Sequence, residues 1–310
     1  MKMYKHVRTL LPLAMLVTSL ANAALPAIQS PSAAGADGEK ITITGVRSSE
    51  RYRIMLDFVS RVGERISGDV GYARLDEAPC FLVQNLPKPA TQYLTARVAS
   101  VVQDAGLTAA PPGCRPNIVI LFADNGKTLA DSLVKQRRGL IKPFFNNENT
   151  VKDATALQAF ATSDSPVRWW QVTVPVDLSG TFYLPGIDLD FLAGTSIPTL
   201  QGMESRMTRS LSDRLLYTIV VVDLNKLGEA TWDQLSDYLA MVSLVQVKPG
   251  PNLAGYDSIL NLFTKPAATP PALSDWDKAY LRGVYDLNRN LNPFSQRGAL
   301  TNNVLNNYYK

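Results

Sequence analysis

Two apolar runs constrain the fold of this chain more than any other feature. Residues 117–122 (NIVILF) are apolar without interruption after Asn117, and residues 217–222 (YTIVVV) repeat the pattern up to Asp223. A strand that is apolar on both faces must be covered on both sides, as in the interior of a parallel sheet packed between helices. Further strands are predicted at residues 41–44, 81–83, 167–174 and, as an edge strand, 182–184.

Segments with apolar residues at helical spacing alternate with these strands. Leu94, Val98 and Val101, for example, predict a helix that begins at Thr91. Other helices are predicted to begin at Ser48 or Ser49, near Leu129, near Met203, at Thr231 or Asp233, and after Ser274. The first half of the chain reads β-α-β-α-β-α, so the expected class is α/β (α+β), with a helix-covered, largely parallel sheet.

The first 23 residues have the pattern of a Sec-type signal peptide. A basic start precedes an apolar run at residues 10–20, and the small residues ANA at 21–23 form a cleavage site. The run is shorter than the ~20 residues that span a bilayer, so no integral membrane segment is expected after cleavage. We expect export to the periplasm or the cell exterior, with residues 24–40 as a flexible leader.

Cleavage removes His6, the only histidine among 310 residues. It also removes Lys2, Lys5 and Arg8 but no acidic residue, so the formal net charge falls from +4 to +1. Without histidine, the mature chain has neither a Ser-His-Asp or Cys-His catalytic site nor an imidazole-rich metal site. A chain that is almost neutral also gives no indication of binding to nucleic acid.

Cys80 and Cys114 are the only cysteines, and both lie in the exported part. In an oxidising compartment, two cysteines allow a single pairing, so we predict a disulfide that closes a loop of about 35 residues. In the loop-entropy model such a bond stabilises the fold by roughly 3–4 kcal/mol. The alternative, a reactive thiol, lacks a histidine partner.

One segment resembles the active-site helix of the metzincin zinc peptidases. Residues 220–247 (VVVDLNKLGEATWDQLSDYLAMVSLVQV) are typical of a strand, a turn and a helix. The helix is similar to the metzincin motif H-E-x-x-H-x-x-G-x-x-H, in which the glycine is often followed by leucine. The alignment places Ser236, Ala240 and Gln246 at the three histidines, Asp237 at the glutamate, and Ser243, followed by Leu244, at the glycine.

Two later segments extend the resemblance. Residues 256–261 (YDSILN) look like the metzincin Met-turn, with Leu260 in the place of the methionine. Residues 273–285 match the closing-helix pattern L-S-x-x-D-x-x-x-L-x-x-x-Y. The chain also resembles secreted proteins of Gram-negative bacteria that lack the zinc-binding histidines.

The resemblance implies a zincin-like mixed sheet with covering helices, a degenerate active-site helix and a small C-terminal helical part. The zincin-like domain would span residues 41–290, with an α/β part at 41–225 and a C-terminal part at 226–290. Residues 291–310, which are rich in asparagine, would follow as a C-terminal tail.

The resemblance also implies that the chemistry of the family is lost. Zinc in these peptidases needs three nitrogen or anionic ligands and a carboxylate that takes a proton from the bound water. Ala240 offers no lone pair, Ser236 and Gln246 offer only neutral groups, and Asp237 is one methylene shorter than glutamate. We expect no bound metal or other cofactor, and a pseudopeptidase that binds a peptide, a protein or another cell-envelope ligand through the vestigial cleft.

Two other functions stay open at this point. One is a carboxylate-based hydrolase acting on envelope glycan. Asp188 and Asp190 would supply two carboxylates either to such acid/base catalysis or to a calcium ion. The protein would otherwise be a structural or assembly factor of the cell envelope. Ser132 and Lys135 match the S-x-x-K pair of penicillin-recognising enzymes, but the companion K-T-G triplet is absent.

Trp169 and Trp170 are neighbours on a predicted strand and therefore point to opposite faces of the sheet. One is expected in the core, and the other on the second face or at the rim of a cleft. Tyr308 and Tyr309, near the end of the chain, have no predicted partner.

Overall fold

The computed structural model describes residues 48–63, 71–137, 154–177 and 211–310. These residues belong to one compact unit, Gly38–Lys310. Several predictions lie outside the described residues: the signal peptide, the leader, the strands at 41–44 and 182–184, and the pair Asp188 and Asp190. Within the described part, no helix is both long enough and apolar enough to cross a membrane.

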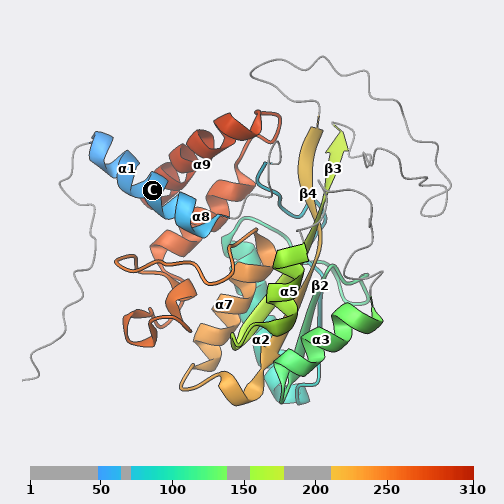
Figure 1. Cartoon of the computed structure of the whole chain (residues 1–310). Coiled ribbons are helices and arrows are strands. Elements are labelled where there is room, and N and C mark those ends of the chain that lie inside the picture. Colours follow the sequence, from blue (N-terminus) through green and yellow to red (C-terminus); the bar gives the residue numbers. More distant parts are fainter. Residues whose placement is uncertain (1–47, 64–70, 138–153, 178–210) are drawn as a thin grey trace, which may run out of the picture. The chain divides into compact units, whose positions relative to one another are not determined.

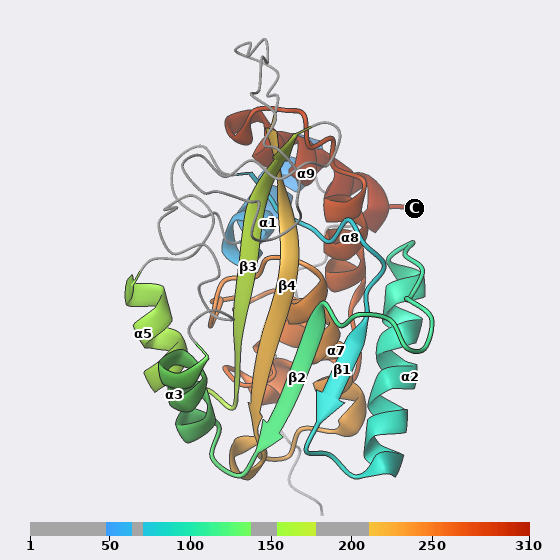
Figure 2. The same ribbon diagram turned by 90° about the vertical axis from the view of Figure 1, so that its right-hand side faces the viewer.

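Four strands form one mixed sheet in the order β1-β2-β4-β3 (Figure 2). β1, β2 and β4 run parallel, whereas β3 is antiparallel to β4 and lies at one end of the described sheet. The bounds are β1 (Phe81–Gln84), β2 (Ile118–Ala123), β3 (Val167–Asp177) and β4 (Leu211–Asp223). The two apolar runs form the two inner strands, β2 and β4, as predicted.

Helices cover both faces of this sheet (Figure 1). On β4, Val220 and Val222 face a core that includes residues of α2 and α7, whereas Ile219 and Val221 face a second core that includes residues of α3 and α5. The helix bounds are α2 (Lys88–Asp104), α3 (Gly126–Gln136), α5 (Ala154–Thr162) and α7 (Trp232–Leu244). The α/β class predicted from the sequence is confirmed.

β3 and β4 are longer than their apolar patterns indicate. β4 begins at Leu211 rather than Tyr217, and β3 ends at Asp177 rather than Val174. The helix predicted at residues 203–211 does not include Leu211, which is the first residue of β4, and its other residues lie outside the described part. The added residues of β4 include polar side chains, but they pair with β3 in antiparallel register, so backbone hydrogen bonds hold them in the sheet.

The C-terminal segment is a helix rather than a tail. α9 (Pro293–Tyr308) begins at Asn292, whose side chain accepts a hydrogen bond from Ser295 N at 2.8 Å. It packs against α8 (Asp275–Tyr285) and α1 (Ser48–Val62). Asparagine residues separate its buried positions, such as Leu300 and Val304, which is why the apolar pattern is weak.

Tyr308, for which the sequence predicts no partner, packs on the inner side of α9. Its ring centroid lies 4.9 Å from that of Trp276 on α8. The end of α9 therefore belongs to the packed part of the protein, whereas Tyr309 is 42% exposed.

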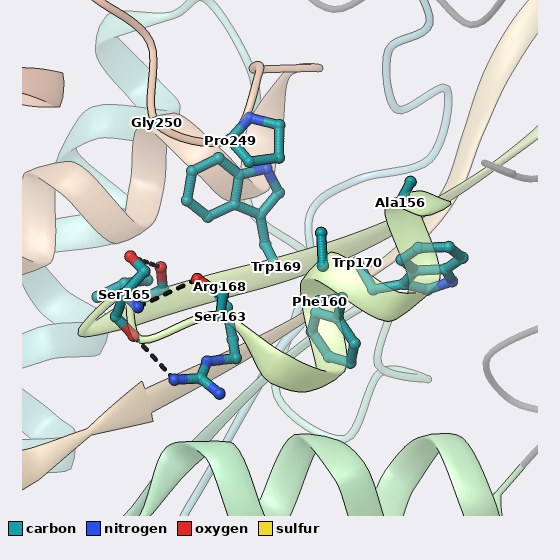
Figure 3. A pocket seen from close by; sticks show the side chains of 11 residues that line it. Ala156, Phe160, Ser163, Ser165, Arg168, Trp169, Trp170, Pro249 and Gly250 are labelled. Atoms are coloured by element: carbon teal, nitrogen blue, oxygen red, sulfur yellow. Dashed lines mark hydrogen bonds between the residues drawn. The ribbon is translucent and has the colours of Figure 1, made fainter. Parts of the chain in front are cut away.

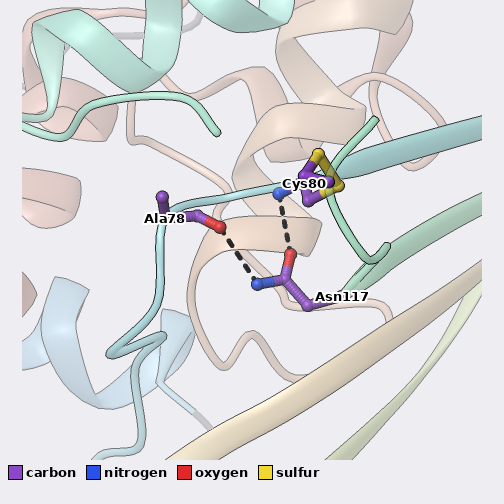
Figure 4. The surroundings of a disulfide bond; sticks show 4 residues. Ala78, Cys80 and Asn117 are labelled. Atoms are coloured by element: carbon purple, nitrogen blue, oxygen red, sulfur yellow. Dashed lines mark hydrogen bonds between the residues drawn. A yellow bond between two sulfur atoms is a disulfide. The ribbon is translucent and has the colours of Figure 1, made fainter. Parts of the chain in front are cut away.

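The predicted disulfide joins Cys80, just before β1, to Cys114 in the loop before β2, with the two Cα atoms 6.1 Å apart (Figure 4). Asn117 supports this corner. Its Oδ1 accepts from Cys80 N at 2.8 Å, and its Nδ2 donates to Ala78 O at 3.1 Å. The bond therefore fixes the N-terminal ends of two adjacent parallel strands.

Candidate functional site

The residues aligned with the metzincin motif lie on and just after α7. A capping box starts this helix: Thr231 Oγ1 accepts from Gln234 N at 3.2 Å, and Gln234 Oε1 accepts from Thr231 N at 3.1 Å. Ser236, Asp237, Ala240 and Ser243 lie on the helix, Gln246 follows its end, and Leu260 lies in a short 3₁₀ turn, Ile259–Asn261, packed against α7. All six side chains are buried, with at most 2% exposed.

Both carboxylate oxygens of Asp237 accept hydrogen bonds inside the protein. Arg97 on α2 donates from Nε to Oδ1 at 2.7 Å and from Nη2 to Oδ2 at 2.8 Å. Leu273 N donates to Oδ2 at 2.7 Å. The carboxylate raises the pKa of Arg97, chiefly through these hydrogen bonds. A carboxylate held in this way is not accessible to a substrate.

The other aligned positions do not converge on a common point. Ser236 Oγ donates to Trp232 O at 2.6 Å, one turn back along its own helix. Gln246 Oε1 accepts from Ala73 N at 3.0 Å, in a segment before β1. Ala240 has no polar side-chain atom. Among the described residues, no group of three or more His, Cys, Asp and Glu side chains could hold a metal ion.

The three segments that resemble metzincin motifs are in contact with one another. Asp277, at the start of α8, accepts from Ser258 Oγ at 2.6 Å, from Ile259 N at 2.8 Å and from Ser274 N at 3.1 Å. These bonds tie the turn at residues 258–261 to the closing helix. Burial raises the pKa of Asp277 to about 6, although the hydrogen bonds oppose this rise.

Two hydrogen bonds attach residues 273–285, the closing-helix segment, to α7. Leu273 N binds Asp237, as described above, and Tyr285 Oη, at the other end of α8, donates to Leu244 O at 2.7 Å. The residues at both ends of the closing-helix pattern therefore contact the aligned helix. This arrangement is a structural junction, built mainly from buried carboxylates and backbone groups.

Trp169 and Trp170 face opposite cores, as predicted. Trp169 Nε1 donates to Val247 O at 3.1 Å on the α7 side, and Trp170 packs against Phe160 of α5 with ring centroids 5.8 Å apart. Both side chains are buried. Lys135 of the S-x-x-K pattern points to solvent and pairs with Asp131 at 2.7 Å.

Sequence reasoning missed Arg97, the residue that engages Asp237. The available signal is its position beside the apolar stripe of α2, next to Val98. A basic residue at such a place must find a partner when the helix packs. The sequence alone does not indicate which acid that partner is.

The comparisons with known proteins add no relative. No family model matches the chain, and no significant match was found among curated proteins or solved structures.

Proposed function

We propose that this chain is an exported, non-catalytic protein with a zincin-like scaffold, which acts by binding a peptide rather than by cleaving it. This proposal rests on one observation, the burial and hydrogen bonding of Asp237. The carboxylate at the position of the catalytic glutamate is 1% exposed and bonded to Arg97 and Leu273. A general base needs access to a water molecule at the scissile bond, and this carboxylate has none.

The contacts between the three motif-like segments support the scaffold. Asp277 connects the turn at 258–261 to α8, and Asp237 connects α7 to Leu273. Segments that resemble parts of one active site are therefore neighbours in space. The signal-peptide pattern favours a place of action in the cell envelope.

The ligand must bind elsewhere than at the aligned side chains. Ser236, Asp237 and Gln246 are each at most 2% exposed, so a ligand does not touch them. β3 lies at one end of the described sheet, and a pocket opens beside its first residues. The described lining of that pocket includes no carboxylate, so nothing there favours a carboxylate-based hydrolase.

A peptide library tests the proposal. The mature chain, residues 24–310, is immobilised and incubated with random synthetic peptides, with added zinc or with a chelator. Mass spectrometry then identifies retained peptides and new peptide ends. We expect a subset of peptides to be retained intact, with the chelator having no effect.

Two variants and a second ligand sharpen the result. Asp237→Asn, assayed where it is folded, should retain the same peptides, as should the surface control Asp131→Asn. New peptide ends that disappear with the chelator would overturn the proposal. Retention of no peptide would also overturn it, and co-sedimentation with peptidoglycan in that case would favour a glycan ligand.

A further inference from the structure

The pocket beside β3 has the size of a small-molecule site (Figure 3). Its volume is about 240 Å³, and its walls come from α5, the start of β3 and the turn at Pro249 and Gly250. Phe160 and Trp169 contribute aromatic surface. An apolar cavity of ~150 Å³ holds a benzene ring, so this pocket accommodates one aromatic ring with a short polar group.

Arg168 belongs to the wall of this pocket, and hydrogen bonds to described residues satisfy its guanidinium only in part. The residue is 3% exposed, and its Nη2 donates to Ser165 O at 2.9 Å. Among the described residues, its Nε and Nη1 have no hydrogen-bond partner. Burial lowers the pKa of Arg168, and the more distant Asp223 and Asp164 only partly oppose this effect.

A buried guanidinium with two nitrogen atoms that lack hydrogen-bond partners in the described part of the chain is unfavourable, because its lost hydration is only partly replaced. The hydroxyl groups near it do not supply a partner. Ser165 Oγ donates to Val167 O at 2.7 Å, and Ser163 Oγ accepts from Ser165 N at 3.1 Å. An anionic group that enters the pocket would accept hydrogen bonds from these two nitrogen atoms.

We propose that this pocket binds the carboxylate end of an apolar ligand, specifically the C-terminus of a peptide whose last residue is aromatic or branched. Phe160 and Trp169 contact the apolar group. Arg168 pairs with the carboxylate through Nε and Nη1, while Nη2 keeps its hydrogen bond to Ser165 O. The inference rests on the proposed peptide-binding function, but it does not depend on the zincin resemblance.

Three small probes test the inference on the mature chain by titration calorimetry. N-acetyl-phenylalanine mimics a peptide C-terminus, its amide lacks the charge, and 3-phenylpropionate lacks the peptide group. A hydrogen-bonded charge pair contributes roughly 1.5–3 kcal/mol, so the acid should bind about ten to a hundred times more tightly than the amide. N-acetyl-phenylalanine should also bind more tightly than 3-phenylpropionate.

Variants locate the effect. Arg168→Met should bind acid and amide equally, whereas Arg53→Met, at an exposed position on α1, should keep the preference for the acid. Ala159→Phe places a ring at the exposed rim of the pocket and should weaken both probes. If Arg168→Met does not fold, two measurements still test the inference. They are the ratio of acid to amide affinity in the wild type and the affinities of both probes for Ala159→Phe.

Three results would overturn the inference: equal affinity of the wild type for acid and amide, a preference that survives in Arg168→Met, or no saturable binding. Tighter binding of 3-phenylpropionate than of N-acetyl-phenylalanine would overturn the assignment to a peptide C-terminus. If the peptide library is retained intact while acid and amide bind equally, the proposed function stands and this inference fails. If the library is cleaved, the proposed function fails whatever the probes show.

Discussion

Arg97 on α2 and Asp237 on α7 form a two-point ion pair, with Nε 2.7 Å from Oδ1 and Nη2 2.8 Å from Oδ2. The same carboxylate accepts from Leu273 N at 2.7 Å. Asp237 therefore connects a covering helix, the aligned helix and the segment that leads into α8. In the resemblance this position belongs to a catalytic glutamate, whereas here the carboxylate holds three parts of the fold together.

Removing this pair should destabilise the protein. Asp237→Ala leaves Arg97 and Leu273 N without their acceptor, and we expect a loss of about 2–4 kcal/mol in the free energy of unfolding. The value lies below that of a fully buried pair, because the Arg97 side chain is 34% exposed. Urea unfolding followed by tryptophan fluorescence measures it.

A double-mutant cycle separates the pair from its surroundings. Asp237→Asn and Arg97→Gln, alone and together, should give a coupling energy of about 1–2 kcal/mol. The matched control is Asp131 with Lys135, a pair at 2.7 Å whose side chains are 44% and 72% exposed. Its coupling should not exceed about 0.5 kcal/mol. Equal coupling in the two cycles would contradict a structural role for Asp237.

The pH dependence of stability should carry the signature of Asp277. Its folded pKa of about 6 lies above the ordinary value of 3.8, because the side chain is buried. Its contribution to stability is therefore fully present below about pH 3.8 and is lost as the pH rises through about 6. The loss amounts to about 3 kcal/mol.

Asp277→Asn tests this dependence, because the amide does not titrate. The difference in unfolding free energy between wild type and variant should fall by about 2 kcal/mol from pH 4 to pH 7, because part of the loss has already occurred at pH 4. Asp275→Asn removes the same charge from the exposed side of the same helical turn and should follow the wild-type profile. If the unfolding free energies of wild type and Asp277→Asn changed with pH in the same way, the raised pKa of Asp277 would be excluded.

Gly283 should be required for the packing of α8 against α9. A Cβ at this position would lie 2.7 Å from Val304 Cγ2 and 3.1 Å from Val304 N. Gly283→Ala should therefore destabilise the protein by about 1–3 kcal/mol, despite the better helix propensity of alanine. Thermal and urea unfolding measure the effect.

Gly298 in α9 is the matched control, because the nearest atom to its Cβ position is Tyr52 Oη at 3.5 Å. Gly298→Ala should be neutral or stabilise by up to about 1 kcal/mol. Two alanine variants of equal stability would show that the contact between α8 and α9 is not as described.

The disulfide should contribute strongly to stability. It joins residues 34 positions apart, and the loop-entropy model gives about 3–4 kcal/mol for a loop of this length. Cys80→Ser with Cys114→Ser should lose this amount in urea unfolding. A reductant should lower the stability of the wild type to that of the double variant and leave the variant unchanged. A wild type insensitive to reductant under unfolding conditions would refute this prediction.

The inner part of the sheet could be predicted from the sequence, because its residues follow simple patterns. The runs that became β2 and β4 are apolar on both faces, and α7 and α8 begin at capping residues, Thr231 and Ser274. The start of β4 and the helix α9 were missed for one physical reason. Backbone pairing holds Ser212 and Asp213 in the strand, and only a few apolar positions anchor α9, so neither has a strong apolar period.

The site could be predicted only in part. The alignment indicated residues of α7 that the structure places in the junction, whereas the closing-helix pattern contained Asp277 without indicating that it caps α8. The partners of these residues come from distant segments: Arg97 reaches Asp237 across a separation of 140 residues, and Gln246 binds Ala73 N across 173. Arg168 lies in an apolar strand, where a charged residue is itself a signal of a special environment.

Zinc content tests the central claim most directly, namely that the junction around Asp237 is structural and holds no catalytic metal. The mature chain is incubated with zinc, desalted and analysed by elemental mass spectrometry alongside Asp237→Asn. We predict far less than one zinc per chain in both proteins. One tightly held zinc per wild-type chain, absent from Asp237→Asn, would contradict the account.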